Sequence, residues 1–231
     1  MELCIDTSTR WAGIALAQDG VIAREASWYS RQNHTMEVAP AVQHLLGLES
    51  LTIPELSAIV IAIGPGNFSA LRTGLSLVKG FVQAAGLPVV AVGSLEVEAY
   101  PYVGLGRPVC PLLDAGRGNL AWAIYEGFKE GEPLVLTEEQ VSTLEEVLRA
   151  APSNTIYCGE GISKVREELE SQVSLEATLA LAPSPTRHLS ALAQLGHLGL
   201  QTGRTADPAT LQPRYLRGPA ISKPKPPKRI K

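Results

Sequence analysis

Residues 33–40 read N-H-T-M-E-V-A-P and place an imidazole and a carboxylate one helical turn apart, at His34 and Glu37. Side chains three residues apart share a helix face, so the pair has the spacing of half a metal site. A two-histidine helix site needs a second imidazole one turn later, and Val38 stands there. The other histidines show no ligand spacing with His34, and a lone histidine near a helix start is usually a cap or an interface contact. We therefore expect no metal site.

Two short turns begin with an acid and suggest nucleotide chemistry: D-T-S-T-R at Asp6 and D-A-G-R-G-N-L at Asp114. The first resembles a phosphate-binding turn, in which backbone N–H groups and hydroxyls face a phosphate. The alternative is that Asp6 and Thr7 only cap a strand turn, and the spacing does not choose between them. The second turn lacks the run of glycine and threonine that wraps a phosphate. We expect no nucleotide to bind this chain alone.

A third glycine-rich element, G-P-G-N-F-S, occupies residues 64–69. Pro65 removes one backbone donor, and the Lys-Ser/Thr ending of a phosphate loop is missing. The element predicts a tight strand-to-helix turn whose helix is capped by Asn67 or Ser69. Neither a Ser-His-Asp nor a Cys-His nor a paired-carboxylate arrangement stands out in the sequence, so we expect no catalytic residue and no cofactor.

The composition of the 231-residue chain is that of layered α/β structure, with 45% hydrophobic but only 5% aromatic residues. The cysteines lie in apolar, strand-like runs and are expected to be buried thiols: Cys4, Cys110 and Cys158. The N-terminus lacks the basic start and apolar core of a signal peptide, and no run approaches the roughly 20 apolar residues of a membrane span. We expect a soluble, cytoplasmic protein without a membrane partner.

Apolar periodicity and turn residues predict the elements that carry these turns. The Asp19-Gly20 pair is a hairpin signal between two alternating segments. The expected order is strands over 3–6, 11–18 and 21–26, a helix over 35–47, a strand over 58–63, a helix over 69–85 and a strand over 89–92. The last strand, helix and strand form a parallel crossover unit.

The pattern restarts near residue 100. V-C-P-L-L-D-A-G-R-G-N-L-A-W-A-I-Y-E-G repeats an apolar strand, an acid, a small-residue turn and an alternating strand, and a strand over 155–158 leads to a helix from Ile162. Asp114 and Arg117 match Asp6 and Arg10. This duplication predicts the two-lobed α/β fold of actin, the heat-shock ATPases and the sugar kinases (the ASKHA fold), with an N-terminal lobe over 1–100 and a degenerate C-terminal lobe over 101–217.

Residues 218–231 form a basic, proline-rich tail that we expect to be disordered. Five cations lie in K-P-K-P-P-K-R-I-K, so the formal charge of −3 for the whole chain becomes −8 for residues 1–217. Such a tail can attract a polyanion or only keep a chain end soluble.

Several motifs occur in the order found in one known family: I-D-T-S-T-R, N-H-T-M-E-V-A-P, A-I-G-P-G-N-F-S-A-L-R-T-G, L-D-A-G-R-G-N-L-A-W-A-I-Y-E and P-R-Y-L-R. The chain thus resembles the bacterial TsaB (YeaZ) family. The resemblance implies a non-catalytic partner of TsaD in making threonylcarbamoyladenosine beside the tRNA anticodon, together with the ATPase TsaE. The catalytic relative carries a metal-binding H-x-x-x-H where this chain has His34 and Val38. Two alternatives are an autonomous small-molecule kinase of the same fold and a metallopeptidase-like enzyme.

The helices over 35–47 and 69–85 are the expected surface for TsaD, as half of a four-helix interface. A homodimer is a second possibility when the chain is alone. On the second helix, Gly74 lies among small residues that would admit a partner helix closely. The expected interface residues are His34, Met36, Val38, Val42, Leu45, Ala70, Leu71, Gly74, Leu75, Val78 and Phe81. The basic tail is the expected place of a weak tRNA contact.

Overall fold

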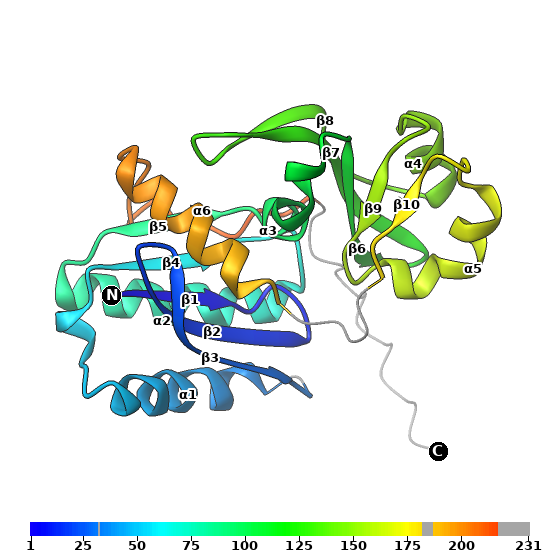
Figure 1. Cartoon of the computed structure of the whole chain (residues 1–231). Helices are drawn as coiled ribbons and strands as arrows, with labels where there is room; N and C mark the ends of the chain where they lie inside the picture. Colours follow the sequence, from blue (N-terminus) through cyan, green and yellow to red (C-terminus); the bar gives the residue numbers. More distant parts are fainter. Residues whose placement is uncertain (32, 182–186, 217–231) are drawn as a thin grey trace, which may run out of the picture.

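The computed structural model describes residues 1–31, 33–181 and 187–216, and they form two lobes that are each built on a five-stranded sheet (Figure 1). The strand orders are β3-β2-β1-β4-β5 and β10-β9-β6-β7-β8. In each sheet, three strands form an antiparallel meander and two more run parallel to its first strand. The predicted duplication of one α/β topology is confirmed.

The first sheet consists of β1 (Glu2–Asp6), β2 (Trp11–Gln18), β3 (Val21–Tyr29), β4 (Ala58–Ala62) and β5 (Val89–Val92). Strand β1 is buried along its whole length because it lies between β2 and β4, with helices over both faces. The predicted Asp19-Gly20 turn is present. Both residues have positive φ, 52° and 76°, which the two central residues of a type I′ turn require.

The second sheet consists of β6 (Val109–Gly116), β7 (Asn119–Lys129), β8 (Glu132–Ser142), β9 (Ile156–Cys158) and β10 (Thr178–Leu179). The sequence pattern ends the alternating strand at Gly127, whereas β7 continues to Lys129 and turns into β8. Strand β8 was missed because it is an edge strand, half exposed along its length and interrupted by glutamates. An edge strand of this kind lacks a buried face that would give a clean period of two.

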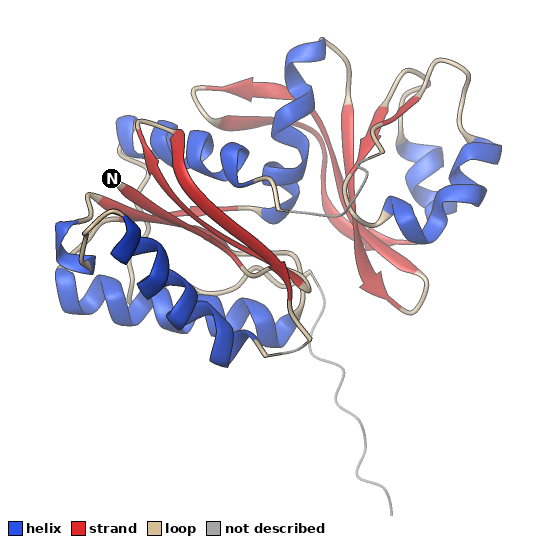
Figure 2. Cartoon of the chain, turned by 60° about the horizontal axis from the view of Figure 1, so that its bottom comes forward, coloured by secondary structure: helices blue, strands red, loops and turns tan. Residues whose placement is uncertain are grey.

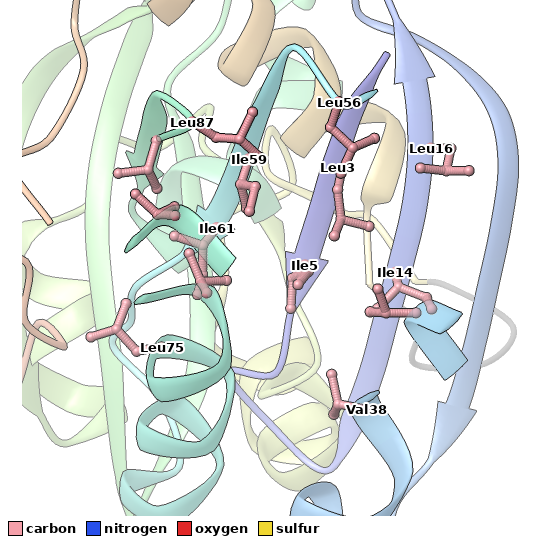
Figure 3. Close-up of a cluster of buried hydrophobic side chains, with 14 of the residues drawn as sticks. Leu3, Ile5, Ile14, Leu16, Val38, Leu56, Ile59, Ile61, Leu75 and Leu87 are labelled. Carbon is pink, nitrogen blue, oxygen red and sulfur yellow. The ribbon is translucent and has the colours of Figure 1, made fainter. Parts of the chain in front are cut away.

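Helices cover both faces of the first sheet (Figure 2). Helices α1 (His34–Leu48) and α2 (Phe68–Ala85) pack on one face, and Figure 3 shows Val38 of α1 and Leu75 of α2 against Ile5, Ile14 and Ile61 of the strands. The opposite face carries α6 (Leu189–Gln201) and α3 (Ser94–Ala99). On the second lobe lie α4 (Leu144–Ala150) and α5 (Ile162–Gln172), and short 3₁₀ turns occur at Ile53–Glu55 and Tyr100–Leu105.

Helix α3 joins the lobes. Its Val97 packs with α6 and the first sheet, while Leu95 and Ala99 pack with strands of the second sheet. The two sheets are therefore attached to opposite sides of one buried helix.

The last described segment returns to the first lobe, so the predicted C-terminal lobe over 101–217 needs a correction. Helix α6 packs on β1, β2, β4 and β5, and Gly196 and Gly199 bring it close to the sheet. A Cβ at Gly199 would lie 2.7 Å from the Val90 side chain, and one at Gly196 would overlap Val60. The segment 187–216 thus completes the layer that the first sheet needs on its second face. The basic tail over 218–231 lies outside the described residues.

The same substitution at two helical glycines tests this packing. We expect Gly196→Ala to destabilise the chain by about 1–3 kcal/mol, because its methyl group has no room against Val60. We expect Gly80→Ala in α2 to stabilise it by about 0.5–1 kcal/mol, because nothing lies within 4 Å of the added carbon and alanine favours a helix. Urea unfolding of both variants gives the two values. Equal effects would show that α6 does not pack on the sheet as described.

Candidate functional site

The first acidic turn directs its polar groups into the protein. Asp6 Oδ1 accepts hydrogen bonds from the Ser8 backbone N–H at 2.8 Å and from Ser8 Oγ at 2.6 Å. Thr7 Oγ1 donates to the carbonyl of Ala70 in α2 at 2.9 Å. Asp6, Thr7 and Ser8 are all buried. These side chains therefore have the capping role that the sequence left open as one of two alternatives.

The G-P-G-N-F-S loop closes over this turn. The Asn67 backbone N–H donates to the Ser8 carbonyl at 2.6 Å, and a Cβ at Gly66 would overlap the same carbonyl. Asn67 Oδ1 accepts from the Ala70 N–H at 3.1 Å, so Asn67 caps α2 as predicted. The loop is a structural cover for the first turn.

One cation lies at the centre of the molecule, where the two lobes meet. The Arg187 guanidinium is fully buried, and its Nη2 lies 2.7 Å from Glu98 Oε1 and 3.3 Å from Glu160 Oε2. Its Nη1 lies 3.6 Å from Asp6 Oδ2 and donates to Ser8 Oγ at 3.2 Å. The carboxylates come from β1, from α3 and from the turn between β9 and α5. Arg187 thus connects the first acidic turn to helix α3 and to the second lobe.

Three carboxylates share this one guanidinium, so negative groups outnumber positive ones. This excess of negative charge affects the protonation of Glu98. Burial raises the pKa of Glu98 to about 7; Arg187 opposes this shift, and Asp6 and Glu160 add to it. Burial lowers the pKa of Arg187, but the three carboxylates outweigh burial and raise it overall. His188 Nε2 lies 3.7 Å from Glu98 Oε2, and burial with Arg187 lowers its pKa, which favours the neutral imidazole. Glu98 therefore exchanges a proton near neutral pH.

A cleft of about 720 Å³ lies between the lobes, at the two acidic turns. Its charged and polar groups are paired with one another. Lys164 forms an ion pair with Asp114 Oδ2, and Asp114 Oδ1 accepts from the Gly116 N–H at 3.0 Å. Arg10 Nη1 donates to the Tyr29 hydroxyl at 3.1 Å, and Thr9 Oγ1 donates to Glu160 at 3.1 Å.

The described residues that line this cleft include neither histidine nor cysteine. The lining therefore offers neither a histidine as general base nor a cysteine as nucleophile.

The motif N-H-T-M-E-V joins α1 to β3. The Glu37 carboxylate accepts from Trp28 Nε1 at 3.0 Å, and His34 is buried at the first turn of α1. Burial lowers the pKa of His34, although Glu37 and the backbone of Thr9 oppose the shift. The pair therefore lies where the sequence predicts, and Glu37 is held by an indole donor.

The expected interface residues fall into two groups, an exposed one and a buried one. Met36 is 78% exposed and Phe81 is partly exposed, so both are available to a partner. The other nine are buried within the chain: His34, Val38, Val42, Leu45, Ala70, Leu71, Gly74, Leu75 and Val78.

Gly74 illustrates why these residues are buried. A Cβ there would overlap Thr7 Oγ1, so the small residue admits the first turn and not a partner helix. The apolar periodicity identified the side of each helix that packs on the sheet.

The C-terminal motif P-R-Y-L-R meets the G-P-G-N-F-S loop, which the sequence does not reveal. The Arg214 N–H donates to the Ile63 carbonyl at 2.7 Å, and the Tyr215 ring stacks on Phe68 at 4.8 Å. The Arg214 guanidinium bonds Glu96 at 3.0 Å and Glu139 at 2.8 Å. The two motifs are far apart in the chain and form one packed unit.

Comparison with known proteins gives consistent matches. The family model described as TsaD, tRNA N6-adenosine threonylcarbamoyltransferase, matches residues 13–183. The tRNA threonylcarbamoyladenosine biosynthesis protein TsaB of Bacillus subtilis (strain 168) is 30% identical over 218 residues, which cover 93% of each chain. TsaB of Escherichia coli (strain K12) is 30% identical over 132 residues, 56% of each chain.

Solved structures agree in fold. YeaZ from Pseudomonas aeruginosa superposes with a TM-score of 0.76 at 25% identity, covering 93% of this chain and 99% of that one. The polyphosphate/ATP-glucomannokinase of Arthrobacter sp. strain KM, at a TM-score of 0.50 and 15% identity, covers 86% of this chain and 98% of its own and shares the fold alone. Within the described residues, no helix has the length and apolar character of a membrane span.

Removing the Arg187 guanidinium should lower the stability of the chain by an amount that depends on pH. We expect Arg187→Met to lower the free energy of unfolding by about 3–5 kcal/mol at pH 8, because the buried Asp6 and Glu98 and the partly buried Glu160 lose their counterion. At pH 5 the loss should be smaller, because these carboxylates can take up protons. Arg149→Met, which removes an exposed ion pair with Glu145, is the control and should cost about 1 kcal/mol or less at both pH values. An equal loss in both variants would contradict the central role of Arg187.

Glu98 should itself make the wild-type chain less stable as the pH rises. Its pKa increases from 4.5 to about 7 on folding, so the folded chain binds this proton more tightly than the unfolded chain does. Stability is then lost progressively between these two pH values. We expect Glu98→Gln, which keeps an acceptor for Arg187, to flatten this slope in urea unfolding at pH 5, 6, 7 and 8. An unchanged slope would show that Glu98 is not the group that titrates.

Proposed function

We propose that this chain, which belongs to the TsaB (YeaZ) family, acts as a non-catalytic partner of the TsaD transferase and supports its activity. Family membership places the chain in the synthesis of threonylcarbamoyladenosine in tRNA. In this proposal, TsaD performs the transfer and this chain provides a docking surface. The ATPase TsaE joins the two, and the site of action is the cytoplasm.

The observation that carries the non-catalytic role is the interior of the first acidic turn. In a nucleotide-binding member of the fold, the hydroxyls and amides of this turn must face a phosphate. Here they bond Asp6, Ala70 and Arg187. Releasing them would remove the Ser8 hydrogen bonds from the buried Asp6 and the Thr7 hydrogen bond from the Ala70 carbonyl, which is costly. This arrangement supports a scaffold role over the two alternatives, a kinase and a metallopeptidase-like enzyme.

The outer surface of α1 and α2 is the docking site that we propose for TsaD. It consists of uncharged residues that are at least partly exposed, and most of them are small or apolar. We call it the outer α1/α2 face: Met36, Ala39, Pro40, Gln43, Gly47, Thr73, Leu77, Gly80, Phe81 and Ala84. Nothing lies within 4 Å of a Cβ placed at Gly47 or Gly80, so a partner helix can approach both backbones.

An exposed patch of this length without charges is typical of a protein interface. The outer α1/α2 face belongs to the two helices that the sequence predicts as the interface. It consists of their solvent-exposed residues, whereas most of the residues expected from the sequence are buried. When TsaD is absent, a second copy of the chain is the proposed occupant of the same face.

Reconstitution tests the proposed function directly. Modified tRNA is measured with TsaD, TsaE and the enzyme that forms the carbamoyl-adenylate, with and without this chain. We expect product only when both TsaD and this chain are present. Product from this chain without TsaD would revive an enzymatic role, and equal product without this chain would remove the partner role.

A single glycine on the outer α1/α2 face tests the docking site. We expect Gly80→Arg to leave the chain folded, since the side chain enters open space, and to weaken pairing with TsaD at least 100-fold by calorimetric titration. Gly104→Arg is the matched control, because Gly104 is also exposed with nothing within 4 Å and lies in the turn at Tyr100–Leu105. Equal TsaD affinity in both variants would place the interface elsewhere.

The basic tail is proposed to contact tRNA, on the basis of its sequence alone. Deleting residues 219–231 should spare pairing with TsaD and weaken tRNA binding by the assembled complex at low salt. Three to five phosphate contacts would change the slope of log affinity against log salt by roughly 3 to 4.5. Identical salt titrations of the full-length and truncated complexes would leave the tail without a role in nucleic-acid binding.

A further inference from the structure

Three potential metal ligands meet on the side of the first lobe that carries α6. Glu2 begins β1, Asp19 lies in the turn between β2 and β3, and His197 belongs to α6. One ligand atom from each lies within 4.8 Å of the other two. They come from separate parts of the chain, so the sequence spacing that predicted no metal site could not reveal them.

Glu2 is the observation that points to a ligand. Only 7% of the residue is exposed, and its Oε2 is buried without a hydrogen-bond partner. Along β1, Glu2 has the same parity as Cys4, which packs in the cluster beneath α6, so its side chain is on the α6 side of the sheet. A buried, unpaired carboxylate is costly unless a cation accompanies it.

The surrounding contacts hold the other two residues near Glu2. Gln194 of α6 donates its amide to the Gly20 carbonyl at 3.0 Å and so holds the turn of Asp19 against the helix. His197 follows Gln194 by one helical turn, and the Gln201 amide nitrogen lies 2.9 Å from its Nε2. Turning this amide so that its oxygen faces the ring lets Nε2–H donate to it, which leaves Nδ1 as the nitrogen that binds the metal.

The spacing suits a shared ion better than a direct ion pair. His197 has neither carboxylate within the 4.0 Å of an ion pair in the described structure. A metal about 2.0–2.2 Å from each ligand would draw these atoms to about 3–4 Å from one another. Rotation of the exposed Asp19 and the half-buried His197 provides this small adjustment, while Glu2 stays fixed.

We propose that Glu2, Asp19 and His197 bind one divalent transition-metal ion, for which Zn²⁺ is the probe. An imidazole with two carboxylates favours Zn²⁺ or Mn²⁺ over Mg²⁺ and Ca²⁺, which prefer oxygen ligands only. Three protein ligands leave a position for water. The ion would fasten α6 to β1 and to the β2–β3 turn, so its role is to hold the C-terminal helix on the first lobe. The site lies apart from the interlobe cleft and does not depend on the proposed function.

The test is titration of the metal-free full chain, without an N-terminal tag or a polyhistidine tag, with Zn²⁺ in competition with a chromophoric chelator. We expect one equivalent to bind with a dissociation constant of about 10 µM or lower. His197→Ala and Glu2→Gln should each weaken binding at least tenfold. His44→Ala and His34→Ala are the controls, an exposed and a buried histidine of α1, and should bind Zn²⁺ as the wild type does.

A thermal scan gives a second readout, because a metal that binds only the folded chain raises its melting temperature. Zn²⁺ should raise it in the wild type and in His44→Ala, and not in His197→Ala, whose half-buried side chain is not needed for folding. The proposal fails if binding is weaker than 100 µM, if all variants bind equally, or if His44→Ala loses as much as His197→Ala. Binding of Mg²⁺ as tight as that of Zn²⁺ would overturn the proposed class of metal.

Discussion

The buried guanidinium of Arg187 is the contact on which the arrangement of the two lobes depends. It meets Asp6 from the first lobe, Glu98 from the bridging helix α3 and Glu160 from the second lobe, within 3.6 Å of each. A buried charge of this kind is tolerated only with partners in good geometry, so none of these elements can move far without exposing an unpaired ion. The same residue precedes α6, the helix that covers the second face of the first sheet.

This central cation also explains why a nucleotide-type fold can have another use. The duplicated turns lie at one cleft, but Arg187 and α2 bond the polar groups of the first turn, and Lys164 pairs with Asp114 of the second. The chain keeps the stability of the two-lobed fold while the cleft has few free polar groups. In this account the available surface of the first lobe is the outer α1/α2 face, on the side of the sheet away from α6, where uncharged side chains cover two helices.

The sequence predicted features set by local periodicity and turn chemistry and missed those set by distant contacts. The strands near Leu3 and Val60, the Asp19-Gly20 turn and the Asn67 cap each have a signal within a few residues. Arg187 has none, because its partners lie 27 or more positions away and no local pattern marks a buried arginine. Helix α6 was missed because glycines interrupt its apolar run, and those glycines are where it touches Val60 and Val90. For the interface, the apolar spacing indicated which residues of each helix are buried. The residues that remain exposed, and so are available for docking, can be recognised only in the structure.

The central claim is that this chain supports tRNA modification through its outer surface and not through chemistry in the cleft. The most direct measurement is the rate of tRNA threonylcarbamoylation in the reconstituted system when the chain carries Asp114→Asn together with Lys164→Ala. Both side chains line the cleft and pair with each other there, so the double variant changes its chemistry without removing a core residue. The account predicts the wild-type rate. A rate lowered tenfold or more, with folding and TsaD pairing intact, would contradict it.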